Sequence, residues 1–233
     1  MVGARWLAGP VMSSRDAILG RIRKSRGRGP LDAAPPRPAH PPLPARAQVE
    51  GEAAVAQFSQ RAEAVSATVT RIATMADLPD SVGAYLASQN LPSDLLVSAD
   101  PRFDSVPWDD RPTLEIRRGA PTKSDLVMMS FAEAAIAETG SLVMSGDAHN
   151  PYMASFVPET AIVVLPKNRI GGGLESAFAG FGDGKEMPRA LTFVTGPSRT
   201  GDIGLQIELG AHGPRRVHIV IVENDGDEEN PLP

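Results

Sequence analysis

Hydrophobic positions follow two spacings along this chain, and each spacing predicts a different element. Apolar side chains recur every three to four residues over 47–63, 80–89 and 174–181, which places them on one face of a helix. Short apolar or alternating runs predict strands instead. These runs occupy residues 67–72, 95–97, 125–129, 141–145, 161–165, 191–195 and 216–222.

The order of these elements predicts an α/β domain. A compact apolar pattern over 131–137 predicts one more helix, which ends at Glu138-Thr139-Gly140. The continuous apolar run over 161–165 is typical of a central strand that is buried on both faces of a parallel sheet. Because strands alternate with helical segments, we expect a mainly parallel sheet sandwiched by helices.

The N-terminal part of the chain has a different pattern. A serine at position 13 or 14 caps a short predicted helix that ends near Arg26 and carries basic residues around a small apolar face. Seven prolines follow between Pro30 and Pro44, which predicts an extended linker. The expected organisation is a basic extension with a short helix (1–26), a proline-rich linker (27–46), an α/β domain (47–222) and an acidic, disordered tail (223–233).

The net charge of −5 is unevenly distributed. Residues 1–47 hold nine Arg or Lys and two Asp or Glu, whereas residues 223–233 hold five acids and no base. A basic arm suits a nucleic acid or an acidic partner. No aromatic platform or basic recognition helix follows this arm, so a solvated arm is the favoured interpretation and a nucleic-acid partner is not.

Composition excludes several classes of site. The 233 residues contain no cysteine, so the chain cannot hold an iron–sulfur cluster, a Cys-ligated zinc ion or a disulfide scaffold, and four scattered histidines predict no metal site. No apolar run approaches the roughly 20 residues of a membrane-spanning helix. Residues 1–11 lack the core of an export signal, and the start at Met12 favours interpreting them as an upstream extension. We therefore expect a cytoplasmic protein.

The densest polar stretch is Gly196–Gly204, which follows a predicted strand. Arg199 offers a planar donor to a carboxylate or phosphate, and the hydroxyls of Ser198 and Thr200 can donate to the same anion. Successive amides of such a turn form an anion nest. Parallel sheets bind ligands at the carboxyl ends of their strands, so we expect an anion site here. The alternative is a tight turn in which Arg199 pairs with Asp202.

Two smaller clusters carry candidate chemistry. His212 lies beside Gly213 in a constrained turn, where an imidazole can act as an acid or base or donate to an anion. The alternative is a ring that bonds a nearby carbonyl. Glu138 can act as a base or nucleophile, with Thr139 and Gly140 beside it, and the alternative is a polar turn at a helix end. One edge of the sheet can gather all three clusters, although spacing alone does not show it.

Glycine patterns for nucleotide binding are incomplete. The stretch after 195 lacks the Gly-Lys-Ser/Thr of a phosphate-binding loop. Gly171-Gly172-Gly173 lacks the third glycine of a dinucleotide fingerprint, because Ser176 stands at that position. The glycine triplet therefore predicts a flexible loop before a helix.

The three clusters, in this order, resemble motifs of the lactate-utilization protein C family (LutC/YkgG). The matching segments are Ala-Ile-Ala-Glu-Thr-Gly-Ser-Leu-Val at 135–143, Pro-Glu-Thr at 158–160, Thr-Gly-Pro-Ser-Arg-Thr at 195–200 and His-Gly-Pro at 212–214. The segment that begins Ser13-Ser-Arg-Asp is similar to the opening helix of that family, so the resemblance covers about 12–222. The chain departs from the family at Gly204, where the family usually has Glu, and at Ala161, where it often has His.

The resemblance implies a fold like that of the NagB, ribose-5-phosphate isomerase and CoA-transferase group. It also implies a component of an L-lactate utilization system that oxidises lactate to pyruvate. The chain would bind no cofactor and would act as the accessory subunit, with a pocket for a small anion, beside two partner proteins that carry iron–sulfur clusters. The alternatives are a stand-alone transferase- or ligase-like enzyme acting on a CoA or phosphate compound, and a nucleic-acid-binding regulator acting through the basic arm.

Overall fold

The computed structural model describes residues 13–27, 42–146, 156–179, 181, 188–200 and 208–225. The chain divides into two units, Met1–Pro42 and Leu43–Pro233. No helix in the described ranges is both long and apolar enough to span a membrane.

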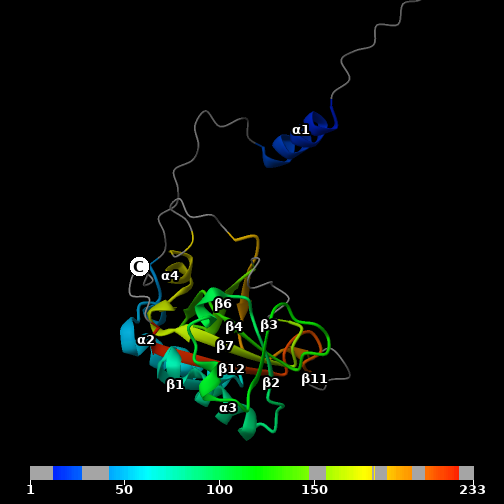
Figure 1. Ribbon diagram of the computed structural model, residues 1–233. Coiled ribbons are helices and arrows are strands. Elements are labelled where there is room, and N and C mark those ends of the chain that lie inside the picture. Colours follow the sequence, from blue (N-terminus) through cyan, green and yellow to red (C-terminus); the bar gives the residue numbers. More distant parts are fainter. Residues whose placement is uncertain are drawn as a thin grey trace, which may run out of the picture. The chain divides into compact units, whose positions relative to one another are not determined.

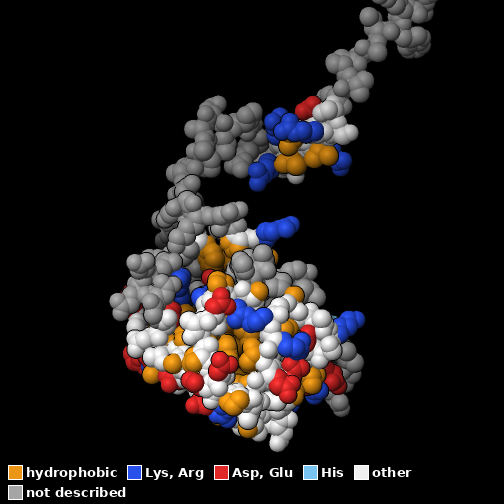
Figure 2. Space-filling view, in the orientation of Figure 1, with side chains coloured by type: hydrophobic (Ala, Val, Ile, Leu, Met, Phe, Trp, Pro, Cys, Tyr) orange, Lys and Arg blue, Asp and Glu red, His pale blue; other side chains and the backbone are white. Residues whose placement is uncertain are grey.

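The N-terminal unit contains helix α1 (Ser14–Arg26). Its first turn is capped by Ser13, whose hydroxyl accepts from the backbone N–H of Asp16, and it ends at Gly27 with a left-handed φ of 62°. No residue of α1 is buried within its unit. Figure 2 shows basic side chains over much of its surface, beside a small apolar patch.

The second unit is built on a six-stranded sheet in which every neighbouring pair of strands is parallel. β12 and β7 lie side by side within it (Figure 1). Every residue of β7 is buried, as its continuous apolar run predicts. The order across the sheet is β1 (Thr68–Thr74), β12 (Arg216–Asn224), β7 (Thr160–Pro166), β4 (Val127–Phe131), β2 (Asp94–Val97) and β3 (Glu115–Arg118).

Helices cover both faces of this sheet. α2 (Gly51–Ala64) buries Phe58 against alternate residues of β7 and β12, such as Leu165. α3 (Leu78–Ser88) buries Leu86 against the opposite face. Because successive side chains of a strand point to opposite faces, a strand between two helical layers must be apolar on both.

A second sheet packs on the α2 side of the first (Figure 1). Its strand order is β8 (Ile170–Gly171), β5 (Ala134–Ile136), β6 (Ser141–Ser145) and β9 (Leu191–Val194). The short helix α4 (Leu174–Ala179) covers its other face through Ala177. A separate antiparallel pair is formed by β10 (Arg199–Thr200) and β11 (Glu208–Leu209).

This architecture confirms the expected α/β fold, but the helix predicted over 131–137 is wrong. Phe131 ends β4, and β5 follows after two residues. Ala135 of β5 packs in the α2 core while Ala134 packs beneath α4. A short strand that is buried on both faces gives the same continuous apolar run as a buried helix, so periodicity alone could not separate them. Glu138 therefore lies in the turn between β5 and β6, not at a helix end.

Candidate functional site

The turn between β5 and β6 packs against α2. Gly140 has a φ of 68°, and a Cβ at this position would lie 2.5 Å from the backbone nitrogen of Ala62, so only glycine fits. The Thr139 hydroxyl lies 2.8 Å from the Ser141 hydroxyl, which lies 2.7 Å from the Thr195 hydroxyl. This chain of hydroxyls joins two of the predicted clusters, at the β5–β6 turn and at the end of β9.

Glu138, in the same turn, contacts residues 46 and 172 rather than the hydroxyl chain. Its side chain is 13% exposed and accepts a hydrogen bond of 3.2 Å from Nε of Arg46. Its backbone N–H donates to the carbonyl of Gly172 at 2.9 Å. Arg46 belongs to residues 43–50, here named the strap, which lead into α2. The carboxylate thus faces the strap.

Arg199 is bound to the end of α2. Its guanidinium donates to the carbonyl of Val65 at 3.0 Å and to the hydroxyl of Ser66. The last carbonyls of a helix lack partners within the helix, so a guanidinium there stabilises the helix end. Gly196, with a φ of 74°, lets the loop approach closely, since a Cβ would lie 2.6 Å from the same Val65 carbonyl. Asp202, the alternative partner of Arg199, lies outside the described residues.

The remaining members of the predicted site meet at the amino end of the main sheet. Ser198 donates its backbone N–H to the carbonyl of Pro214 at 2.8 Å, and its hydroxyl accepts from the backbone N–H of His212 at 3.3 Å. Gly213 lies against the Ser198 side chain. Because Pro214 lies two residues before β12, the stretch Gly196–Thr200 lies at the amino end of the main strands. This corrects the expected position at their carboxyl ends, and the reason is that β9 belongs to the second sheet.

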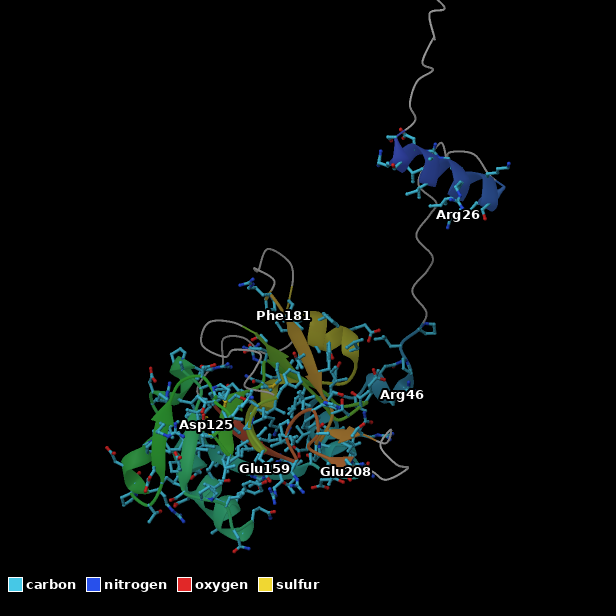
Figure 3. The ribbon with its side chains drawn as sticks, turned by 90° about the vertical axis from the view of Figure 1, so that its right-hand side faces the viewer. Arg26, Arg46, Asp125, Glu159, Phe181 and Glu208 are labelled. Carbon is cyan, nitrogen blue, oxygen red and sulfur yellow. The ribbon has the colours of Figure 1, made fainter. Side chains whose placement is uncertain are left out.

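A cavity of about 500 Å³ adjoins His212, and we name it the amino-end pocket. It lies where β4, β7 and β12 begin, and its labelled members Asp125 and Glu159 lie well away from Arg46 in the view of Figure 3. Its described lining comprises Lys123, Asp125, Leu126, residues 156–159, residues 210–213 and Arg215. Sequence reasoning noted Glu159 in the Pro-Glu-Thr motif but missed the isolated basic residues Lys123 and Arg215, which no motif marks.

A larger cavity of about 940 Å³, the carboxyl-end cavity, lies where β7 and β12 end. Four charged side chains pair with one another there: Arg71 and Lys167 each contact both Glu52 and Glu223. Hydrogen bonds from Arg71 and Lys167 lower the pKa of Glu52 to about 2. The described lining consists of Leu43, residues 47–51, Lys167, Asn168, residues 170–172, Ser176 and Glu223.

Comparison with known proteins supports the fold and finds a matching domain model. Residues 115–222, from β3 to the end part of β12, match the model of the LUD domain. This part of the chain is thus similar to the LUD domain. A solved structure of a DUF162-family protein from Deinococcus radiodurans superposes with a TM-score of 0.55 and 20% sequence identity, covering 75% of this chain and 99% of that one, which supports the fold.

Several curated relatives of this chain are named lactate utilization protein C. The protein from Bacillus licheniformis is 31% identical over 100 residues, 41% of this chain and 42% of that protein. Lactate utilization protein C 1 from Bacillus mycoides is 26% identical over 187 residues, 73% of this chain and 79% of that protein. The match thus spans less than half of the Bacillus licheniformis protein. These relatives confirm the resemblance to the lactate-utilization protein C family.

The glycine triplet 171–173 packs closely against the strap. Gly171 belongs to β8 and pairs with Ile136 of β5, so the flexible loop expected from the sequence is wrong at this position. A Cβ at Gly172 would overlap the carbonyl of Ala47 and lie 2.5 Å from the carbonyl of Val49. The glycines let the strap cross closely over the end of β8.

His218 is a buried histidine within the residues that match the LUD domain. It lies in β12 and is 2% exposed, and its ring stacks on Tyr85 with centroids 3.8 Å apart. Its Nδ1 lies 2.8 Å from the Thr68 hydroxyl. Burial lowers the pKa of His218 to about 4, so the ring is neutral at neutral pH. Within the described ranges, no three His, Asp or Glu side chains are grouped to hold a metal ion.

Proposed function

We propose that this protein takes part in L-lactate utilization, the oxidation of lactate to pyruvate, as an accessory subunit that binds a small anion. The observation that carries the proposal is the 187-residue match to lactate utilization protein C 1 of Bacillus mycoides. Because cysteine thiolates hold iron–sulfur clusters, a cysteine-free chain suits the subunit without a cluster. The partners would be two cytoplasmic proteins that carry the clusters and the electrons.

The contacts of the predicted site residues support a division of labour. Gly140, Gly196 and Arg199 hold loops against the second half of α2, which supports a structural role for them. His212 and Gly213 line a pocket, and that position supports a role in binding. Anion binding therefore falls to the amino-end pocket in this proposal, with Ser198 holding the turn, and proton transfer falls to His212.

Glu138 is the residue on which an enzymatic role would depend. Its half-buried carboxylate accepts from Arg46 and faces the strap rather than His212. The contact with Arg46 supports a structural role for this carboxylate in holding the strap. Turnover of a CoA ester or of ATP by the purified protein, lost in Glu138→Gln, would replace the accessory role with the enzymatic one.

Growth on L-lactate tests the proposed role. A strain that lacks the gene is expected to lose growth on L-lactate as the sole carbon source and to keep growth on glucose, with the first restored by a plasmid copy. Tagged protein from lactate-grown cells is expected to co-purify with two cysteine-rich proteins that contain iron and acid-labile sulfide, as iron–sulfur proteins do. Unchanged growth on L-lactate in the deletion strain contradicts the role.

A further inference from the structure

The carboxylates of the amino-end pocket are neutralised by arginines outside its lining. Asp125 is buried and accepts from Nη2 of Arg117 at 2.6 Å and from the backbone N–H and hydroxyl of Thr122 at 2.6 and 2.7 Å. These hydrogen bonds lower the pKa of Asp125 to about 2, and the bond from Arg117 contributes most. Glu159 lies 3.4 Å from Nη1 of Arg216. Both acids thus already have a cationic partner.

The two cations of the lining are bound less closely. Lys123 is exposed, and in the described part of the chain no carboxylate lies within 4.0 Å of its ammonium. Arg215 is 58% exposed and lies 3.9 Å from Glu159, beyond hydrogen-bonding distance. Arg216 offsets Glu159, whereas Arg117 is shared between Asp125 and Asp94. With Lys123 and Arg215, four cations therefore face three carboxylates, and the pocket keeps a surplus of positive charge.

The turn below the pocket is shaped to hold Arg215 in place. Gly210 has a φ of 82°, and a Cβ there would overlap Cγ of Arg215. The aliphatic part of the arginine therefore lies across the glycine, and the backbone N–H of Arg215 donates to the carbonyl of Glu159 at 2.8 Å. A side chain whose stem is packed loses less conformational entropy when its guanidinium binds a ligand.

Two apolar side chains form part of the wall of this mainly polar pocket. Phe156 is 41% exposed and Leu126 is 48% exposed, and both belong to the described lining. Water in contact with these side chains is released when an apolar group covers them. The lining thus combines a guanidinium, an ammonium and a hydrocarbon surface, a set that suits an anion carrying an organic group better than an inorganic one.

We propose that the amino-end pocket binds a small organic carboxylate, with Arg215 and Lys123 on the carboxylate and Phe156 and Leu126 on its organic part. The guanidinium of Arg215 can donate two parallel hydrogen bonds to the carboxylate. His212 lies at the rim of the same pocket. This site deepens the proposed function, because it rests on the anion-binding role and gives it residues and a ligand class.

Titration calorimetry on the full-length protein tests this site with pyruvate, L-lactate and phenylpyruvate, and with sulfate as the inorganic anion, at constant ionic strength. At least one carboxylate is expected to bind more tightly than sulfate. Arg215→Gln and Lys123→Gln are each expected to raise the dissociation constant of that carboxylate by about 10-fold or more, because a charged hydrogen bond is lost. Arg61→Gln, which removes an exposed arginine of α2, is the matched control and should leave binding unchanged.

Phe156→Ala separates an organic ligand from an inorganic one. The variant is expected to bind the carboxylates less tightly, with the largest loss for phenylpyruvate, and to bind sulfate as tightly as wild type. The proposal would be overturned if no carboxylate binds, if Arg215→Gln and Lys123→Gln bind the carboxylate as tightly as wild type, or if sulfate binds as tightly as any carboxylate. The readout uses purified protein, so a deletion strain that still grows on lactate would contradict the proposed role without touching this result.

Discussion

The two ends of the main sheet differ in how their charges are used. The carboxyl-end cavity is the larger, about 940 Å³ against about 500 Å³, and it occupies the position where parallel sheets usually bind ligands. Its cations, Arg71 and Lys167, are nevertheless each paired with two glutamates. At the amino end, arginines outside the pocket neutralise the acids and leave Lys123 and Arg215 available. Charge that is left for a ligand, rather than size or position, distinguishes the two cavities.

Matched glycine substitutions at the two ends should have the largest and most unequal effect. At the carboxyl end, Gly172→Ala places a methyl group against the backbone of the strap, where neither Ala47 nor Val49 can move aside as a side chain can. We expect a loss of about 3 kcal/mol in the free energy of unfolding, since overpacking against backbone is at the upper end of its usual cost. Urea denaturation measures it.

Gly213→Ala is the control at the amino end. The added Cβ would lie 3.4 Å from the Ser198 Cβ, an ordinary contact, so the urea midpoint should change little. Equal losses in the two variants would mean that the strap is no more closely packed than the pocket, and the contrast between the two ends would fail.

The buried histidine near the amino end should make folding stability depend on pH. The pKa of His218 is about 4 in the folded chain, below the 6.5 of an unfolded one, because burial disfavours the charged ring. Its contribution is complete above pH 6.5 and is lost as pH falls toward 4, where only the unfolded chain takes up the proton. We expect about 2–3 kcal/mol less stability at pH 4.5 than at pH 7.5.

His218→Gln isolates this effect. The variant keeps a hydrogen-bonding side chain beside Thr68 but has no proton to gain, so its unfolding free energy should fall much less between pH 7.5 and 4.5. The window avoids the carboxylates Glu52 and Asp125, whose lowered pKa values of about 2 matter only below about pH 4.5. An identical pH slope in wild type and variant would assign the dependence to other groups.

Sequence was sufficient where one strong pattern decided the outcome. The helical spacing of apolar residues over 47–63 predicts α2, and Phe58 of the expected face is buried against the sheet, whereas Ala53 and Ala56 are exposed. The run of β7 likewise predicts a strand buried on both faces. Such patterns are read within one element, so they need no knowledge of distant residues.

The sequence could not supply partners that lie far along the chain. Arg199 stands in a conspicuous glycine-rich motif, but its contacts, Val65 and Ser66, lie more than 130 positions away. Lys123 and Arg215 stand in no motif, and only the folded strands bring them to one pocket. Local chemistry therefore located the region of Ser198 and His212, while the assignment of Arg199 to a ligand, rather than to a helix end, was beyond what spacing can decide.

The Arg199 contact predicts a moderate effect on stability. Arg199→Ala removes the donor to the Val65 carbonyl at the end of α2, and the loss should be about 1–2 kcal/mol, typical of a hydrogen bond with a charged partner that is partly solvated. Arg199→Lys should recover part of it. Thermal denaturation gives the comparison, and carboxylate binding measured on the same variants should stay unchanged. A variant that unfolds like wild type but loses binding would return Arg199 to the ligand site.

The smallest expected effect comes from the charge network itself. Glu52→Gln leaves Arg71 and Lys167 with Glu223 as their remaining partner, so the melting temperature should fall slightly in low salt. The difference should shrink in 1 M NaCl, where charges are screened over about 3 Å. Lys123→Gln should leave the melting temperature unchanged in either salt, because its ammonium contacts no carboxylate among the described residues. A salt-sensitive loss in Lys123→Gln would mean that this lysine already has a partner within the protein, and the amino end would then have no more charge to spare than the carboxyl end.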